Sequence, residues 1–234
     1  MSLLTRKPRP IANRDKEPES LRDDRLFIIA SDDTWAPKQY FGFFQLTRVQ
    51  IHVVPTTDGT SVAQHVLSRL VTFEYEEDDE RWMVLDTDHL TQGTHLGGFL
   101  RAMQDALNQG VKVALSKPCF ELWLLLHHVS EADVENLANA HDTEAALRVA
   151  IGEYRKTNLK REHYPLASVA LAIERAERLD RPIKGELLPT VNTTRVYKLW
   201  QAIASKALPT QLPKELTAAV SASSGSSTTD EYSG

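Results

Sequence analysis

The first half of the chain alternates short β-rich runs with segments of helical periodicity. The β-rich runs occupy residues 25–30, 51–54, 82–85 and 111–115. Helices are expected between them, one beginning at Pro37, one with Val66 and Leu70 on its apolar face, and one running from Leu96 to Leu107. Strands separated by helices of this length form a parallel sheet with right-handed crossovers. The pattern therefore predicts an α/β fold with a mostly parallel sheet of about four strands, flanked by helices.

The second half of the chain reads as helical. Residues 120–126 are apolar on nearly every side, which predicts a buried helix. Ser130 with Asp133 is typical of a capping box, and Asp142 is expected to cap the next helix. Two apolar stripes at helical spacing follow, at Val169, Ile173, Ala176 and Leu179, and at Val196, Leu199, Trp200 and Ile203.

These patterns divide the chain into four predicted regions. Residues 1–24 form a flexible basic arm, because prolines interrupt a stretch of lysines and arginines. Residues 25–128 form the α/β core, and residues 129–208 form a helical extension packed on it. Residues 209–234 are rich in Ser, Thr and Ala with few large apolar groups, which predicts a disordered tail.

Composition excludes several classes of protein. The chain has 234 residues and one cysteine, Cys119, which rules out an internal disulfide framework and a cysteine-rich zinc site. No apolar run approaches the roughly 20 residues that a membrane-spanning helix needs, and the N-terminus is too polar for a secretory signal. We therefore expect a cytoplasmic protein without a membrane segment. The formal net charge of −5 does not suggest a nucleic-acid binder, but charge is distributed unevenly along the chain.

The third β-rich run ends in two acidic residues, Asp86 and Asp88. If the strand includes both, their side chains point to the same face, because side chains alternate along a strand. Neighbouring carboxylates repel each other, and a hard cation such as Mg²⁺ relieves that repulsion because it prefers oxygen ligands. Open α/β sheets place ligands at the carboxyl ends of their strands. The motif therefore predicts a metal site, although the same motif is also typical of a turn or a helix start.

Basic residues gather again in the second half, at Arg155, Lys156, Lys160 and Arg161. Contacts with phosphates dominate the affinity of proteins for nucleic acid. This cluster is therefore a candidate for holding a nucleic-acid backbone. The alternative interpretation is an ordinary solvated helix end and loop.

Several segments resemble the RloB-like family, which also includes the AbiLii abortive-infection proteins. The longest is Ser116–His127, which is similar to the family pattern Ser-Asn-Pro-x-Phe-Glu-x-Trp followed by apolar residues and a histidine. Asp86 and Asp88 match the family's Asp-x-Asp, and segments 172–176 and 189–197 resemble its closing helices. The likeness covers most of the chain and implies a core of the Toprim type.

The first strand departs from the family pattern, which has Glu-Gly followed by Thr-Glu-x-x-Tyr-Phe. Aligning Tyr40 and Phe41 with that pattern places Asp32 at the glutamate and Asp33 at the glycine. Aspartate is one methylene shorter, and an offset near 1 Å costs roughly a hundredfold in rate when it displaces reacting groups. Either Asp32 still binds metal or moves protons, or the site is degenerate. Asp33 is expected to cap or turn the loop.

The resemblance implies a nuclease that depends on Mg²⁺ or Mn²⁺. Asp32, Asp86 and Asp88 would hold the metal, and the catalytic residues would be Asp32, Glu121 and His127. Glu121 and His127 also have ordinary structural interpretations. A carboxylate at a helix start satisfies backbone donors, and a buried histidine commonly bonds a carbonyl or an acid.

The family likeness further implies an effector of a prokaryotic anti-phage or abortive-infection system, acting on RNA, with tRNA among the candidates, or on DNA. It implies a partner ATPase of the AAA type or an ABC-like kind, encoded alongside, and it is compatible with a homo-oligomer. The alternative function is a catalytically degenerate regulatory subunit that binds nucleic acid or the ATPase.

Overall fold

The computed structural model describes residues 24–56, 62–88 and 95–225 of the chain. In order, the first elements are β1 (Arg25–Ser31), α1 (Ala36–Gly42), β2 (Val49–Val53), α2 (Ala63–Val71), β3 (Glu80–Asp86), α3 (His95–Asn108) and β4 (Lys112–Lys117). The helices and last strand of the second half are α4 (Glu121–Leu126), α5 (Ala140–Ile151), α6 (Leu166–Asp180), β5 (Thr193–Thr194), α7 (Val196–Lys206) and α8 (Lys214–Gly225). Short 3₁₀ helices lie between them: η1 (Glu131–Asp133), η2 (Arg161–His163), η3 (Arg181–Ile183) and η4 (Pro209–Gln211). Each strand and helix predicted in the first half is present within a few residues of its expected bounds.

Five strands form one sheet in the order β2-β1-β3-β4-β5. The strands from β2 to β4 pair in parallel, and β5 pairs antiparallel with β4. The predicted α/β fold with a mostly parallel sheet is confirmed, with one strand more than expected. The two residues of β5, Thr193 and Thr194, are too short a run to be recognised as a strand from periodicity. A hydrogen bond of 2.8 Å joins the hydroxyls of Thr194 and Ser116 on β4.

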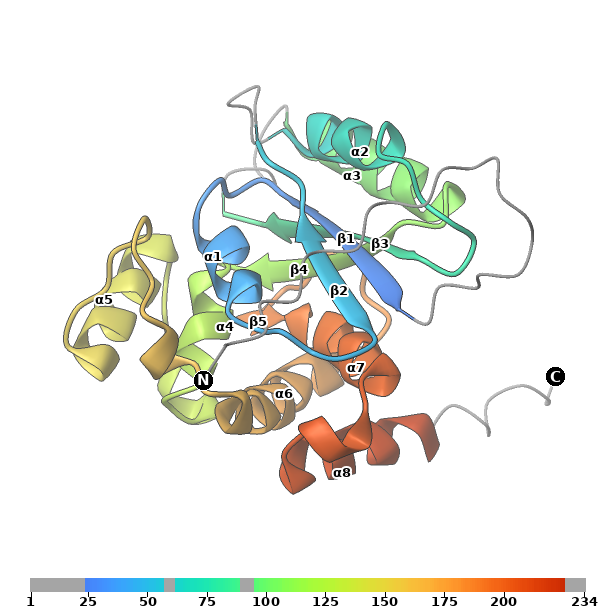
Figure 1. Ribbon diagram of the computed structural model, residues 1–234. Coiled ribbons are helices and arrows are strands. Elements are labelled where there is room, and N and C mark those ends of the chain that lie inside the picture. The colour runs from blue at the N-terminus through green and yellow to red at the C-terminus, as the bar shows by residue number, and fades with distance from the viewer. Residues whose placement is uncertain (1–23, 57–61, 89–94, 226–234) are drawn as a thin grey trace, which may run out of the picture.

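Helices cover both faces of the sheet (Figure 1). Because successive strand residues point to opposite faces, Phe27 and Ile29 of β1 belong to one core, and Ile28 and Ala30 belong to the other. The first core includes side chains of α1, α4, α6 and α7, and the second includes side chains of α2 and α3. Burial on both faces explains why the strands read as apolar runs. The carboxyl ends of β3 and β4 point toward the side of the molecule where α1 and α5 lie.

The helical second half is confirmed in its main elements. Both apolar stripes form buried faces, one on α6 and one on α7, and every residue of α4 is buried. The capping box at Ser130 and Asp133 is present, but it opens the 3₁₀ helix η1. The cap assigned to Asp142 is wrong, because α5 begins earlier. Asn139 is the cap, and its side chain accepts the Asp142 N–H at 3.0 Å.

The last part of the chain differs from the prediction. Residues 209–225 are not a disordered tail, because they contain η4 and the helix α8. Leu216 of α8 is fully buried in the same core as α6 and α7. One apolar anchor and several alanines, which are strong helix formers, outweigh the polar composition of this segment. Residues 226–234 and most of the predicted basic arm, 1–23, lie outside the described residues.

A buried ion pair between Arg195 and Asp180 links β5 and α7 to the end of α6. Arg195, which follows β5, donates from Nε to Asp180 Oδ1 at 2.9 Å. Tyr197 donates its hydroxyl to Asp180 Oδ2, also at 2.9 Å. The Arg195 guanidinium also donates to the carbonyls of Glu186 and Leu187. Because a buried charge is tolerated only when it is paired, these contacts fix segment 189–197 at the edge of the sheet.

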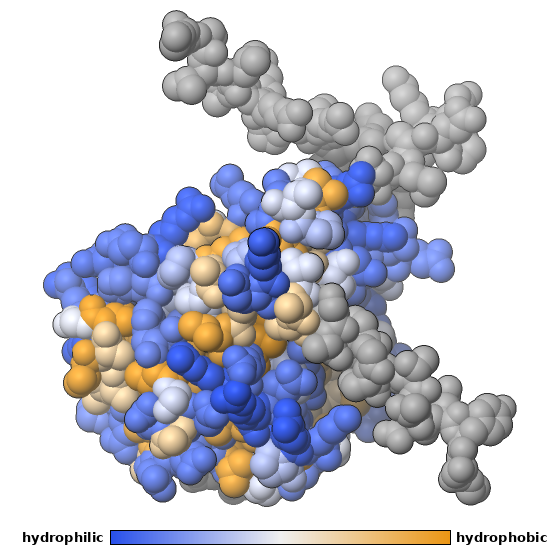
Figure 2. Space-filling view, turned by 90° about the horizontal axis from the view of Figure 1, so that it is seen from below, coloured by the Kyte–Doolittle hydropathy of each residue, from blue (hydrophilic) through white to orange (hydrophobic). Residues whose placement is uncertain are grey.

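Figure 2 shows one face of the molecule, on which hydrophilic side chains predominate. Hydrophobic patches on that face are interrupted by hydrophilic residues. Scattered apolar side chains of this kind are usual and need no partner to explain them. Within the parts of the chain that the structure describes, no helix has the length and apolarity needed to cross a bilayer.

Candidate active site

Two aspartates from neighbouring strands meet at the carboxyl edge of the sheet. Asp32 directly follows β1, and Asp86 is the last residue of β3. These strands pair in parallel with Ser31 opposite Val84, so their carboxyl ends lie together. The backbone N–H of Asp86 donates to Asp32 Oδ2 at 2.9 Å. The parallel topology thus brings together two acids that are remote along the chain.

Asp88 lies two residues beyond β3 and is partly exposed. The expectation that strand alternation points Asp86 and Asp88 to one face does not apply, because the strand ends at Asp86. The charge of Asp88 nevertheless raises the pKa of both Asp32 and Asp86. It therefore contributes to the same negative site.

Burial and mutual repulsion make these acids difficult to ionise. Burial raises the pKa of Asp32 to about 7, against the lowering effect of the hydrogen bond from Asp86, and the charge of Asp33 adds to the rise. Burial also raises the pKa of Asp86 well above its usual range, and the charges of Asp32 and Glu121 add to it. Acids perturbed by burial together with nearby charges are typical of functional sites. A cation bound among them would reverse this effect.

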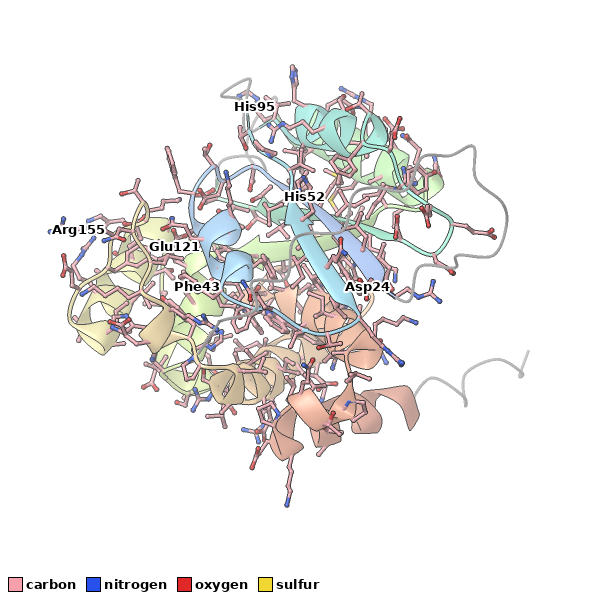
Figure 3. The ribbon with its side chains drawn as sticks, in the orientation of Figure 1. Asp24, Phe43, His52, His95, Glu121 and Arg155 are labelled. Carbon is pink, nitrogen blue, oxygen red and sulfur yellow. The ribbon has the colours of Figure 1, made fainter. Side chains whose placement is uncertain are left out.

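A third acid, Glu121, lies on the helix that follows β4, the strand beside β3. Glu121 is the first residue of α4, which follows β4, and its side chain is buried. Tyr154 donates its hydroxyl to Glu121 Oε1 at 2.7 Å, and Lys156 Nζ lies 3.3 Å from the same oxygen. Figure 3 shows Glu121 beside α1, and Arg155 farther out. The loop after α5 therefore supplies two partners to an acid held by the α/β core.

Asp33 joins the first loop to the same lysine. Its Oδ1 accepts the N–H of Trp35 at 2.8 Å and that of Ala36 at 3.4 Å, so the predicted turn-stabilising role is confirmed. Its Oδ2 lies 3.1 Å from Lys156 Nζ. Burial lowers the pKa of Lys156, but the charges of Glu121 and Asp33 outweigh burial and raise the pKa above its usual value. Lys156 therefore stays protonated between two carboxylates.

Asp32, Asp33, Asp86 and Glu121 form a carboxylate cluster. Those of its oxygens that lack a partner suit a hard divalent cation. Asp32 Oδ1, Asp86 Oδ1 and Glu121 Oε2 are buried and have no hydrogen-bond partner in the described parts of the chain. Leaving such groups unsatisfied is unfavourable, and carboxylate oxygens are the ligands that Mg²⁺ and Mn²⁺ prefer. Among residues 24–56, 62–88 and 95–225, no three Asp, Glu, His or Cys side chains are already arranged to hold a metal ion. The donor chemistry fits, and binding would require side-chain rotation.

His127 has a different set of contacts. One ring nitrogen lies 3.0 Å from the Tyr40 hydroxyl, and the other lies 2.7 Å from Ser168 Oγ. Burial lowers the pKa of His127 well below its usual value, and the charges of His128 and Arg175 add to the lowering. The ring is therefore neutral near pH 7. These contacts favour a packing role, and the catalytic role of His127 stays a prediction.

The predicted basic cluster is divided by the fold. Lys156 points inward, whereas Arg155 Nε pairs with Glu153 Oε1 at 2.7 Å and Lys160 Nζ lies 3.6 Å from Glu153 Oε2. Arg161 lines a separate hollow of about 500 Å³ together with aromatic and apolar side chains. Phosphate binding by Arg155, Lys160 and Arg161 stays a prediction, and for Lys156 the structure adds a role as a counter-ion.

Sequence reasoning missed Tyr154 and Lys156 as partners of Glu121. Tyr154 and Lys156 stand two residues apart in the sequence. The sequence does not reveal, however, that the loop carrying them folds back onto α1. Gln39 of α1 makes that link, because its Nε2 donates to the Lys156 carbonyl at 2.8 Å and its Oε1 accepts the Leu159 N–H at 2.9 Å. No local pattern predicts such a contact between distant segments.

The site lies within a region that is similar to a known family. A model of the RloB-like protein family matches residues 27–203, which include the acids of the sheet edge and the loop that carries Lys156. No curated protein and no solved structure matches the chain.

Proposed function

The chain belongs to the RloB-like family, and on this premise we propose that it is a metal-dependent nuclease that hydrolyses phosphodiesters of RNA, with tRNA among the candidates, or of DNA. The observation that carries the proposal is a group of buried carboxylate oxygens on Asp32, Asp86 and Glu121 that have no hydrogen-bond partner among the described residues. In the described parts of the chain, Lys156 lies beside Asp33 and Glu121 and leaves Asp32 and Asp86 without a cationic partner. Acids that repel each other in this way gain most from binding a cation.

Each residue of the cluster has a role in this proposal. Asp32, Asp86 and Asp88 would hold Mg²⁺ or Mn²⁺, with Glu121 beside them. A bound ion of this class neutralises phosphate charge and lowers the pKa of water. Without a bound ion, burial raises the pKa of Asp32 to about 7, which suits proton transfer near neutral pH. Proton transfer is therefore the alternative to metal binding for Asp32. Lys156 lies beside Glu121 as its counter-ion.

The family premise also supports a role in prokaryotic anti-phage defence. We expect a cytoplasmic effector of an abortive-infection system and a partner ATPase, of the AAA type or ABC-like, that restrains or activates it. A Toprim-like core is part of the same proposal. It is supported by the parallel sheet with acids at the ends of β1 and β3.

A second function is favoured by the position of Lys156. Its ammonium already neutralises Asp33 and Glu121, and aspartate stands at position 32 where the family pattern has glutamate. A site in which a lysine already lies beside two of the acids, and in which Asp32 is one methylene shorter than glutamate, is compatible with a degenerate subunit that binds nucleic acid or the ATPase without cleaving.

Removing the metal ion distinguishes a metal-dependent nuclease from a subunit that binds without cleaving. The purified chain, alone and with the ATPase, is incubated with end-labelled single-stranded and duplex RNA and DNA in Mg²⁺, Mn²⁺ or excess EDTA. We expect cleavage with either metal, background levels in EDTA, and recovery when metal is added back in excess. Cleavage that persists in EDTA would contradict the metal assignment. Binding without cleavage under every condition would establish the regulatory subunit.

A further inference from the structure

An exposed tryptophan, Trp35, lies in the loop beside the carboxylate cluster. The chain has four tryptophans. Trp82, Trp123 and Trp200 are at most 4% exposed, whereas Trp35 is 53% exposed. A single exposed apolar side chain needs no explanation on an ordinary surface. Trp35 differs because it follows Asp33 in the loop that leads from the sheet edge to α1.

The backbone of Trp35 is held firmly although its indole is exposed. Its N–H donates to Asp33 Oδ1 at 2.8 Å. Its carbonyl accepts the Gln39 backbone N–H at 3.2 Å and Gln39 Nε2 at 3.1 Å. The same Gln39 side chain binds the Lys156 carbonyl and the Leu159 N–H. Trp35 is thus fixed between the acidic loop and the loop that carries the site lysine.

We propose that the Trp35 indole is a stacking platform for an unpaired base of a single-stranded nucleic acid, and that it positions the neighbouring phosphate at the carboxylate cluster. This inference rests on the proposed nuclease function and names its substrate class. An aromatic face stacks on any base, and such stacking contributes roughly 1–3 kcal/mol per base by alanine substitution. A platform whose backbone is already fixed loses little freedom on binding.

The charges around Trp35 agree with this substrate. Asp32 and Asp86 repel a phosphate unless a cation binds there. Lys156, Arg155 and Lys160 follow on the adjoining loop, and a phosphate would contact them in competition with the carboxylates that they already face. A single-stranded nucleic acid bound here would place one base on the Trp35 indole and its phosphates near the cluster and the cations of the adjoining loop. In a duplex the bases are already paired and stacked, and exposing one costs a few kcal/mol. Single strands and unpaired loops are therefore favoured over duplexes.

Intrinsic fluorescence gives a direct test, since Trp35 is the tryptophan that solvent and ligands reach most readily. The full-length protein is titrated in Ca²⁺, a hard cation that takes oxygen ligands, with a single-stranded oligonucleotide and with the blunt duplex of the same sequence. We expect the single strand to quench emission and the duplex to do so only at much higher concentration. Parallel anisotropy measurements with a labelled oligonucleotide give the affinities of variants that lack the fluorophore.

Three variants sharpen the test. Trp35→Ala should weaken single-strand binding by about 5- to 150-fold, and Trp35→Phe should retain most of the affinity because it keeps an aromatic face. Leu107→Ala is the matched control, because Leu107 is also 53% exposed but lies on α3, and it should bind as the wild type does.

The outcomes separate this inference from the nuclease proposal. Metal-dependent cleavage with wild-type binding by Trp35→Ala would overturn the platform and leave the nuclease standing. Equal quenching by single strand and duplex would also overturn it. Loss of binding in Trp35→Ala but not in Trp35→Phe, in a protein that cleaves nothing, would support the platform in a non-catalytic binder.

Discussion

Asp86→Asn should reduce metal-dependent cleavage by about 100-fold or more, while the protein stays folded. Loss of an outer partner of a metal ligand alone costs about 10- to 100-fold, so loss of a ligand charge should cost at least as much. Asparagine keeps the shape of the side chain at the end of β3 and preserves the backbone N–H that bonds Asp32. Single-turnover rates at saturating Mg²⁺ or Mn²⁺, with circular dichroism to check folding, measure the effect.

Two further variants test whether the loss of cleavage is specific to Asp86. Asp88→Asn should cause a smaller loss, because Asp88 is partly exposed and lies beyond the strand. Asp105→Asn changes an exposed aspartate on α3 and should leave the rate unchanged. Wild-type cleavage by Asp86→Asn would remove the carboxylate cluster from the mechanism, even if the protein proved to be a nuclease.

Asp32→Asn should stabilise the metal-free protein by about 2–4 kcal/mol at pH 8. Burial raises the folded-state pKa of Asp32 from 3.8 to about 7, and each pKa unit corresponds to about 1.4 kcal/mol. The amide removes a buried charge but gives a weaker acceptor for the Asp86 N–H, which reduces the gain. A site residue that weakens the fold when ionised is expected of a group kept for chemistry.

The direction of the pH dependence follows from proton linkage. Below about pH 4 both folded and unfolded Asp32 are protonated, so the folded state carries no penalty. Between about pH 4 and 7 the unfolded chain releases a proton that the folded chain keeps, so rising pH favours unfolding. The gain from Asp32→Asn should therefore be less than half as large at pH 5 as at pH 8.

Urea denaturation in EDTA at the two pH values measures this difference. Asp105→Asn, again the exposed control, should change the unfolding free energy by no more than about 0.5 kcal/mol. A loss of stability in Asp32→Asn at pH 8, or an equal gain at both pH values, would mean that Asp32 is not held as a strained buried acid.

The part of the site that sequence reasoning could predict is the part governed by sheet topology. Asp32 and Asp86 end apolar runs that had to be buried strands, and parallel strands share one carboxyl edge. Their meeting therefore follows from the pattern of the chain alone. Glu121 follows the next strand for the same reason.

The remaining features depend on contacts that local patterns do not encode. The basic cluster around Lys156 was a candidate for holding a phosphate, with a solvated helix end and loop as the alternative. Lys156 lies instead between Asp33 and Glu121, because Gln39 holds the loop against α1. α8 was missed for a related reason, since its stability depends on burying Leu216 in a core made by other helices.

The division of the site between the two halves of the chain has a consequence during synthesis. A nascent polypeptide carries Asp32, Asp86 and Glu121 well before the ribosome reaches Lys156. Until that loop docks, Glu121 lacks its ammonium and its tyrosine hydroxyl. Incomplete chains, and proteolytic fragments that end near α4, would carry acids without the groups that order them. The full set of contacts around Glu121 therefore forms only after the ribosome has passed residue 156.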